Sequence, residues 1–113
     1  MTVKRAKDSG RGAGGVESRG PAVPDAQQRR KQAGAWLKER RSAAGLSQIE
    51  LAAQLGLKYY TFISQVENGF GRVPIDYMEA WARVLNIEPT AFTRQLISYY
   101  EPELHRLLFE VKK

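Results

Sequence analysis

The stretch that decides the fold is residues 46–69, which read LSQIELAAQLGLKYYTFISQVENG. Ser47 and Glu50 are spaced as a capping box, in which a hydroxyl and a carboxylate three residues apart bond the free N–H groups at a helix start. The helix that they open is expected to run to about Leu55, where Gly56 stops it. The segment therefore begins with a short, well-capped helix.

A second helix is expected from Tyr59 to Glu67, ending at Asn68-Gly69. One stripe along it is apolar and consists of Tyr59, Phe62, Ile63 and Val66. The opposite stripe carries hydroxyl and amide groups and no Lys–Glu pairing to account for them: Thr61, Ser64, Gln65 and Asn68. Two short helices joined by a tight turn with a glycine predict a helix-turn-helix.

The residues before this pair predict a long helix over Ala26–Ala44, with Asp25 as its N-cap. Gly34 weakens the early part, so the firm helix is expected to begin near Ala33. Gly45 ends the helix, since glycine readily adopts the left-handed conformation found there.

The residues after the pair predict three more helices. Asp76 and Glu79 are spaced as a second capping box, ahead of an apolar face of Met78, Trp81, Ala82 and Leu85. Pro89 fits the first turn of the next helix, whose inward positions are Phe92, Leu96 and Tyr99 or Tyr100. Pro102 starts a last short helix that carries Leu104, Leu107, Leu108 and Val111. There is no strand pattern, so the expected fold class is all-α.

Composition excludes several classes of function. Among 113 residues there is no Cys and one His, so a thiolate metal site is impossible and His105 is expected to be an ordinary surface residue. There is no Gly-rich phosphate loop and no nucleophile–base pair, so neither an enzyme nor a cofactor is expected. No apolar run approaches the length of a membrane span. The net charge of +6 favours an anionic partner, first of all nucleic acid.

Residues 1–24 are expected to be a disordered basic tail, because they are rich in Gly and Pro and nearly free of bulky aliphatic residues. Residues 1–32 hold eight basic and three acidic residues, a net +5, which leaves +1 for the rest. Two interpretations stay open for the tail: a solvated segment, or an arm that lies along DNA.

The stretch from Trp36 to Ile87 resembles the lambda-repressor-like family, also called Cro or XRE helix-turn-helix proteins. The resemblance rests on Leu-Ser-Gln-Ile-Glu-Leu-Ala at residues 46–52 and Ile-Ser-Gln-Val-Glu-Asn-Gly at residues 63–69. The chain is one residue longer than the usual motif between these two strings. The resemblance implies a five-helix domain over residues 25–100, with residues 101–113 as an extra short C-terminal helix.

The predicted site lies on the helix 59–67, which is expected to enter the major groove, where hydroxyl and amide groups can bond base edges. The residues expected to face bases are Tyr60, Thr61, Ser64 and Gln65. Those expected to contact the DNA backbone, partly by resemblance, are Gln48, Lys58, Asn68, Gly69 and Arg72. The alternatives are an ordinary solvated helix face for Thr61, Ser64 and Gln65, solvated surface charges for Lys58 and Arg72, and a favourable first helical residue for Gln48. Tyr59 is expected to pack inward, and Glu67 to bond the backbone, Arg40 or Arg41.

The resemblance implies a cytoplasmic, nucleoid-associated transcriptional regulator, with repression of a promoter as the leading hypothesis. A homodimer on a palindromic operator is expected, because one such domain reads few base pairs. Its contact surface is predicted among the apolar residues of 96–111, where intramolecular packing is the alternative. The competing hypothesis is an antitoxin or coactivator that uses these C-terminal helices to hold a protein partner.

Overall fold

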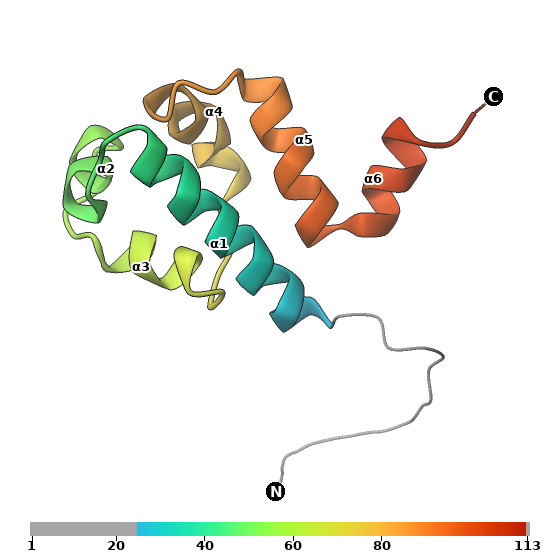
Figure 1. The fold of residues 1–113 in the computed structure, drawn as a ribbon, viewed down its shortest axis with the longest axis horizontal. Coiled ribbons are helices and arrows are strands. Elements are labelled where there is room, and N and C mark those ends of the chain that lie inside the picture. Colours follow the sequence, from blue (N-terminus) through green and yellow to red (C-terminus); the bar gives the residue numbers. More distant parts are fainter. Residues whose placement is uncertain (1–24, 113) are drawn as a thin grey trace, which may run out of the picture.

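The computed structural model describes residues 25–112, which form six helices and no strand (Figure 1). The helices are α1 (Ala26–Ala43), α2 (Gln48–Gln54), α3 (Thr61–Glu67), α4 (Ile75–Val84), α5 (Pro89–Tyr100) and α6 (Pro102–Phe109). The all-α prediction is confirmed for this part of the chain. The tail predicted for residues 1–24 lies outside the described residues.

The core forms where α1 packs against both α3 and α5, and α4 packs against α5. Its largest fully buried side chains come from these helices, from α2 and from the loop before α4: Trp81, Phe92, Leu37, Leu51, Ile63, Leu96, Val66 and Val73. Of the two tyrosines that compete for the inward position at the end of α5, Tyr100 is buried and Tyr99 is half-buried. In Figure 1, α2 lies at one end of the molecule and α6 at the other.

Helix α1 begins at Ala26 with Asp25 as its N-cap, as predicted, and Asp25 accepts a bond from the N–H of Gln28 at 2.9 Å. The expectation that the firm helix begins only near Ala33 is wrong. Gly34 does not interrupt the helix. A glycine stands here because the backbone of α1 approaches the backbone of α3 closely at this position. A Cβ at this position would lie 2.2 Å from the carbonyl oxygen of Glu67. The missing side chain therefore lets α1 pass directly over the end of α3.

The second predicted capping box is wrong. Helix α4 begins at Ile75, its N-cap is Pro74, and no side chain caps it. Asp76 thus lies inside the first turn, two residues after the cap position. A cap that we did not predict occurs at α5, where Glu88 accepts a bond from the N–H of Ala91 at 2.8 Å. This bond and others at the helix start lower the pKa of the Glu88 carboxyl.

Helix α6 packs against α5 and buries none of its residues. Leu104, Leu107 and Leu108 are 44–58% exposed, so the described chain leaves their side chains largely uncovered. His105 differs from the expected surface residue: its side chain is 18% exposed and its Nδ1 lies 2.8 Å from Oε2 of Glu110. Within residues 25–112, no helix has both the length and the apolar character needed to cross a membrane.

Candidate nucleic-acid interface

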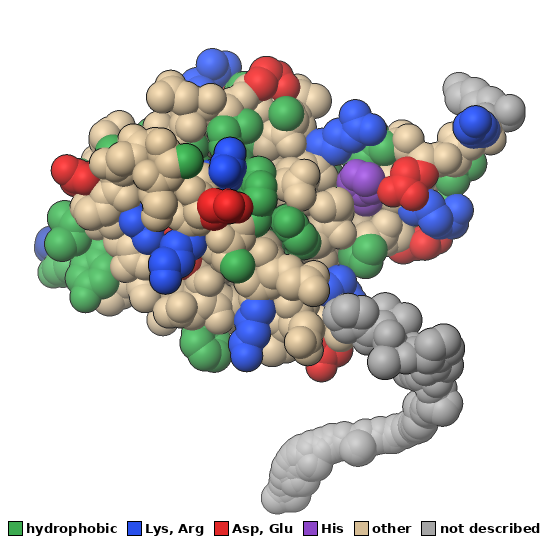
Figure 2. Space-filling view, viewed as in Figure 1, with side chains coloured by type: hydrophobic (Ala, Val, Ile, Leu, Met, Phe, Trp, Pro, Cys, Tyr) green, Lys and Arg blue, Asp and Glu red, His purple; other side chains and the backbone are tan. Residues whose placement is uncertain are grey.

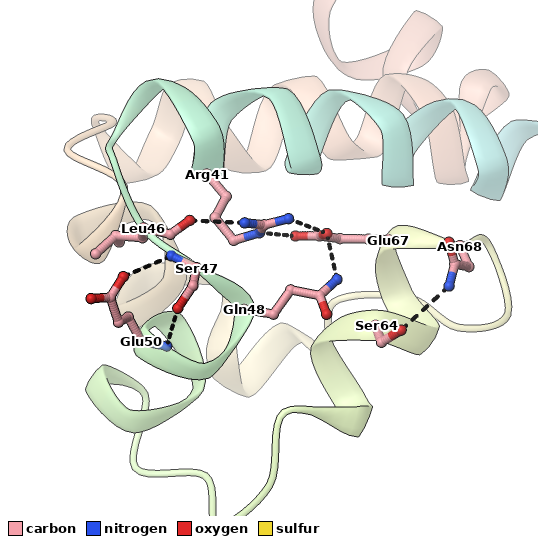
Figure 3. A network of polar contacts seen from close by, with 8 residues as sticks. All are labelled: Arg41, Leu46, Ser47, Gln48, Glu50, Ser64, Glu67 and Asn68. Atoms are coloured by element: carbon pink, nitrogen blue, oxygen red, sulfur yellow. Dashed lines mark hydrogen bonds and ion pairs between the residues drawn. The ribbon is translucent and has the colours of Figure 1, made fainter.

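Helices α2 and α3 form the expected helix-turn-helix. Their inward residues are buried, among them Leu51 and Ala52 on α2 and Ile63 and Val66 on α3. The capping box at the start of α2 is complete, with both reciprocal bonds between Ser47 and Glu50 present (Figure 3). The two helices are thus held in one orientation by local capping and by the shared core.

The turn between α2 and α3 holds the extra residue noted in the sequence. Gly56 adopts a φ of 76°, and the chain then runs through Tyr60 before α3 begins at Thr61, two residues later than predicted. Tyr59 therefore precedes the helix and does not join its apolar stripe. The expectation that Tyr59 packs inward is wrong, since 66% of the residue is exposed.

The four residues expected to face bases lie at the start and along the outer side of α3; we call them the reading strip (Tyr60, Thr61, Ser64 and Gln65). Thr61 and Gln65 are exposed, Tyr60 is 46% exposed and Ser64 is half-buried. Asn68 donates a bond from Nδ2 to Oγ of Ser64 at 3.3 Å, which extends the polar strip by one turn (Figure 3). No neighbouring helix covers Thr61 or Gln65, so their side chains are free to meet a ligand.

A buried ion pair lies behind the reading strip. Arg41 of α1 donates from Nε and Nη2 to the two carboxylate oxygens of Glu67 at 2.8 and 3.0 Å (Figure 3). The side chains are only 11% and 1% exposed, respectively. The bonds to Glu67 raise the pKa of Arg41. Of the partners expected for Glu67, the structure selects Arg41, and the pair fixes the end of α3 on α1.

Gln48 joins this pair from α2. Its Nε2 donates to Oε1 of Glu67 at 3.0 Å, and the residue is half-buried. Because an amide NH2 has two donors, one N–H stays available to a second acceptor. The network therefore holds the Gln48 amide in a fixed orientation at the start of α2, where a phosphate contact was predicted.

The loop after α3 holds Gly69 within the fold. Gly69 is buried, its N–H donates to the carbonyl of Val66 at 3.2 Å, and its own carbonyl accepts a bond from Gln27 at 2.9 Å. Its backbone groups are thus engaged within the fold, and its predicted contact with the DNA backbone stays a prediction. Its φ of 85° makes it a structural turn residue. Lys58 and Asn68 are exposed, as a backbone contact requires.

Arg72, in the same loop, has partners that the sequence did not reveal. Its Nη1 lies 2.9 Å from Oε2 of Glu101, and its guanidinium lies over the ring of Tyr100, 4.6 Å from the centroid. The two charged side chains are 46% and 49% exposed. Arg72 therefore faces solvent, but its charge is already matched by a carboxylate.

Sequence reasoning also missed a basic residue of α1 beside this loop. A Cβ at Gly69 would lie 2.6 Å from Cγ of Lys31, which shows how closely Lys31 approaches the end of α3. Lys31 is exposed. The count of charges over residues 1–32 contained the signal, because three of the eight basic residues (Arg29, Arg30 and Lys31) lie on α1.

The rest of the surface is mixed in charge. Figure 2 shows Lys and Arg side chains interspersed with Asp and Glu over the visible face. Hydrophobic side chains gather at the end of the molecule formed by α2 and the turn that follows it (Figure 2), where Ile49 and Tyr59 are each 66% exposed. Among residues 25–112, no group of three or more His, Cys, Asp or Glu side chains is placed to hold a metal ion.

Comparison with known proteins supports the geometry. Residues 37–92, from the second half of α1 to the first turn of α5, match the model of the HTH_3 family, described as helix-turn-helix. A search of curated proteins finds no match. The matched region contains the reading strip, the Arg41–Glu67 pair and Arg72, and it excludes α6.

Proposed function

Because the chain belongs to the Cro/C1-type helix-turn-helix family of DNA-binding regulators, we propose that it is a repressor that binds a palindromic operator as a homodimer, with α3 in the major groove. The observation that carries the proposal is the reading strip. Its side chains are polar and uncharged, all of them except Ser64 are exposed, and the helix that presents them is anchored from behind by a buried ion pair.

The chemistry of the strip suits base edges in the major groove. Gln65 can pair bidentately with adenine, and the methyl group of Thr61 can contact the methyl group of thymine. Ser64 and Tyr60 carry hydroxyl groups that both donate and accept, so they suit several bases or a sugar edge. We assign direct readout to these four residues.

Backbone contacts are assigned to residues on both sides of the strip. Lys58 precedes α3 in the turn, Asn68 follows it, and Arg72 lies in the next loop. Gln48 offers its remaining amide donor from the start of α2. These contacts position the helix on the duplex without reading sequence.

The dimer is proposed from α6. Five apolar residues at the C-terminal end are 38–58% exposed: Leu104, Leu107, Leu108, Phe109 and Val111. Exposed apolar residues that are concentrated in one short segment mark an interaction site more often than apolar residues scattered over a surface. A second copy would cover the patch and place two reading helices on half-sites about 34 Å apart.

Selection of bound sites from random duplex DNA with the full chain tests this proposal. A specific motif repeated with two-fold symmetry, at a spacing of one helical turn, is the expected result. Recovery of unselected sequence would refute direct readout by α3. A motif without symmetry would refute the dimer and leave readout standing.

A protein-interaction role, as in an antitoxin or a coactivator, is favoured by one further observation. A groove beside α6 is lined mainly by apolar groups of α4 and α5, among them Ile75, Met78, Pro89 and Ile97, and Phe109 of α6 closes one side. Size-exclusion chromatography with light scattering separates the two roles. A stable dimer of the purified chain supports the homodimer, and a monomer that binds no DNA supports the partner protein.

A further inference from the structure

The loop that follows α3 is fastened to the junction of α5 and α6 through two consecutive residues on each side. Arg72 pairs with Glu101 at 2.9 Å, and the N–H of Val73 donates to the hydroxyl of Tyr100 at 3.2 Å. Glu101 is both the C-cap residue of α5 and the N-cap residue of α6. The loop assigned to the DNA backbone and the helix assigned to the dimer thus meet at one joint.

The two contacts of this joint differ in how far they are buried, and therefore in how easily another group can replace one partner. Val73 and Tyr100 are 1% and 6% exposed, so their hydrogen bond is part of the core. The Arg72–Glu101 pair is about half exposed on both sides, and exposed pairs of this kind contribute little stability. The buried contact holds the loop in place, while the exposed pair is free to exchange.

We propose that Glu101 competes with a DNA phosphate for Arg72 and thereby lowers the affinity of the protein for DNA. This inference rests on the proposed function. Glu101 is then a positioning residue, since it acts on DNA only through Arg72. A guanidinium fits a carboxylate and a phosphate with the same forked geometry, so one acceptor can replace the other without moving the loop.

The ring of Tyr100 holds the Arg72 side chain in place while a phosphate replaces Glu101 as its partner. The guanidinium of Arg72 lies 4.6 Å from the ring centroid, a cation–π contact that does not use the N–H donors. Removal of the Glu101 carboxylate therefore leaves Arg72 stacked in the same position with its charge unmatched. The variant should present a better phosphate site, not a disordered side chain.

Glu101→Gln tests the proposal in the full chain, with Kd measured for the selected operator and for unrelated duplex DNA. We expect binding two- to five-fold tighter to both, because loss of an exposed pair is worth about that factor and a phosphate contact carries no sequence information. Glu101→Asp, which keeps the charge, should bind like the wild type. The melting temperature should fall by a few degrees at most.

Two controls separate this effect from a general change of charge. Glu103→Gln removes the same charge two residues away, where the partner is Arg106 at 2.6 Å, and should leave the affinity unchanged. In an Arg72→Ala background, whose affinity should depend on salt with a slope shallower by about one, Glu101→Gln should have no effect. Equal gains in Glu101→Gln and Glu103→Gln, or a gain that persists without Arg72, would overturn the competition. Absence of DNA binding in every variant would overturn the proposed function itself.

Discussion

Replacing Gly34 by alanine should destabilise the protein and displace α3. A Cβ at position 34 would lie 2.2 Å from the oxygen of Glu67, 2.6 Å from its carbonyl carbon and 2.7 Å from the oxygen of Val66. All three atoms belong to the backbone of the last turn of α3. Ordinary carbon–oxygen contacts begin near 3.3 Å, so the two helices must separate by roughly 1 Å.

The magnitude follows from two opposing effects. Overpacking of this kind typically destabilises by about 1–3 kcal/mol, and backbone atoms cannot rotate away as a side chain would, which places Gly34→Ala at the upper end. Alanine is better than glycine inside a helix by about 1 kcal/mol. The free energy of unfolding should therefore fall by about 2 kcal/mol, with a drop in Tm of roughly 10 °C for a domain of this size.

Urea unfolding followed by circular dichroism measures the stability, and a gel-shift series measures DNA binding by the folded fraction. Gly45→Ala is the matched control, because Gly45 has a φ of 77° but open space around it. It should lose about 1 kcal/mol through backbone strain and bind DNA like the wild type. Gly34→Ala should also bind several-fold more weakly, since its α3 is displaced. A Gly34→Ala variant as stable as the wild type would refute the close approach of α1 to α3.

Three further outcomes are expected. Arg41→Met leaves the carboxylate of Glu67 buried without a cation and should lower the free energy of unfolding by about 3–5 kcal/mol in urea titrations. Gln65→Ala should weaken operator binding by about 1–3 kcal/mol and relax the preference at one base pair, whereas unchanged discrimination in gel shifts would disprove the assignment. Glu88, whose pKa is lowered by its helix-start bonds, should titrate by NMR below the ordinary glutamate value of about 4.5. Its contribution to stability is then present above the unfolded pKa and is lost as the pH falls through the lowered one, and Glu88→Gln should abolish that dependence.

The parts of the fold that local chemistry determines could be predicted from the sequence. Ser47 and Glu50 cap α2 because their reciprocal bonds need only four consecutive residues. Gly45 and Gly56 end their helices with positive φ, as glycines at such positions do. Asp76 and Glu79 show the limit of the same argument, since the helix begins at Ile75, two residues earlier than a cap at Asp76 would require, and Asp76 is left in its first turn.

The parts that depend on distant residues could not be predicted. In the sequence, Gly34 weakens a helix, and only the position of α3 shows that a larger residue would not fit there. Gly69 follows the motif as a loop glycine that could face a phosphate, and only the position of Gln27, 42 residues away, shows that its carbonyl is occupied. Periodicity gives the face of a helix but not its neighbour, so the outward position of Thr61 and Gln65 was predictable while the partners of Gln48 were not.

The same long-range contacts determine how the protein would divide its affinity between bases and phosphates. Arg41, close behind the reading strip, is neutralised by Glu67, and Arg72, in the adjoining loop, is paired with Glu101. Among the described residues, the proposed interface therefore presents uncharged hydroxyl and amide groups at its centre. Attraction to phosphate alone is sequence-independent, so pairing these cations would lower binding to all duplexes and leave discrimination to the base contacts. A single domain built this way would bind weakly, and this argues physically for the second copy that we propose on the exposed face of α6.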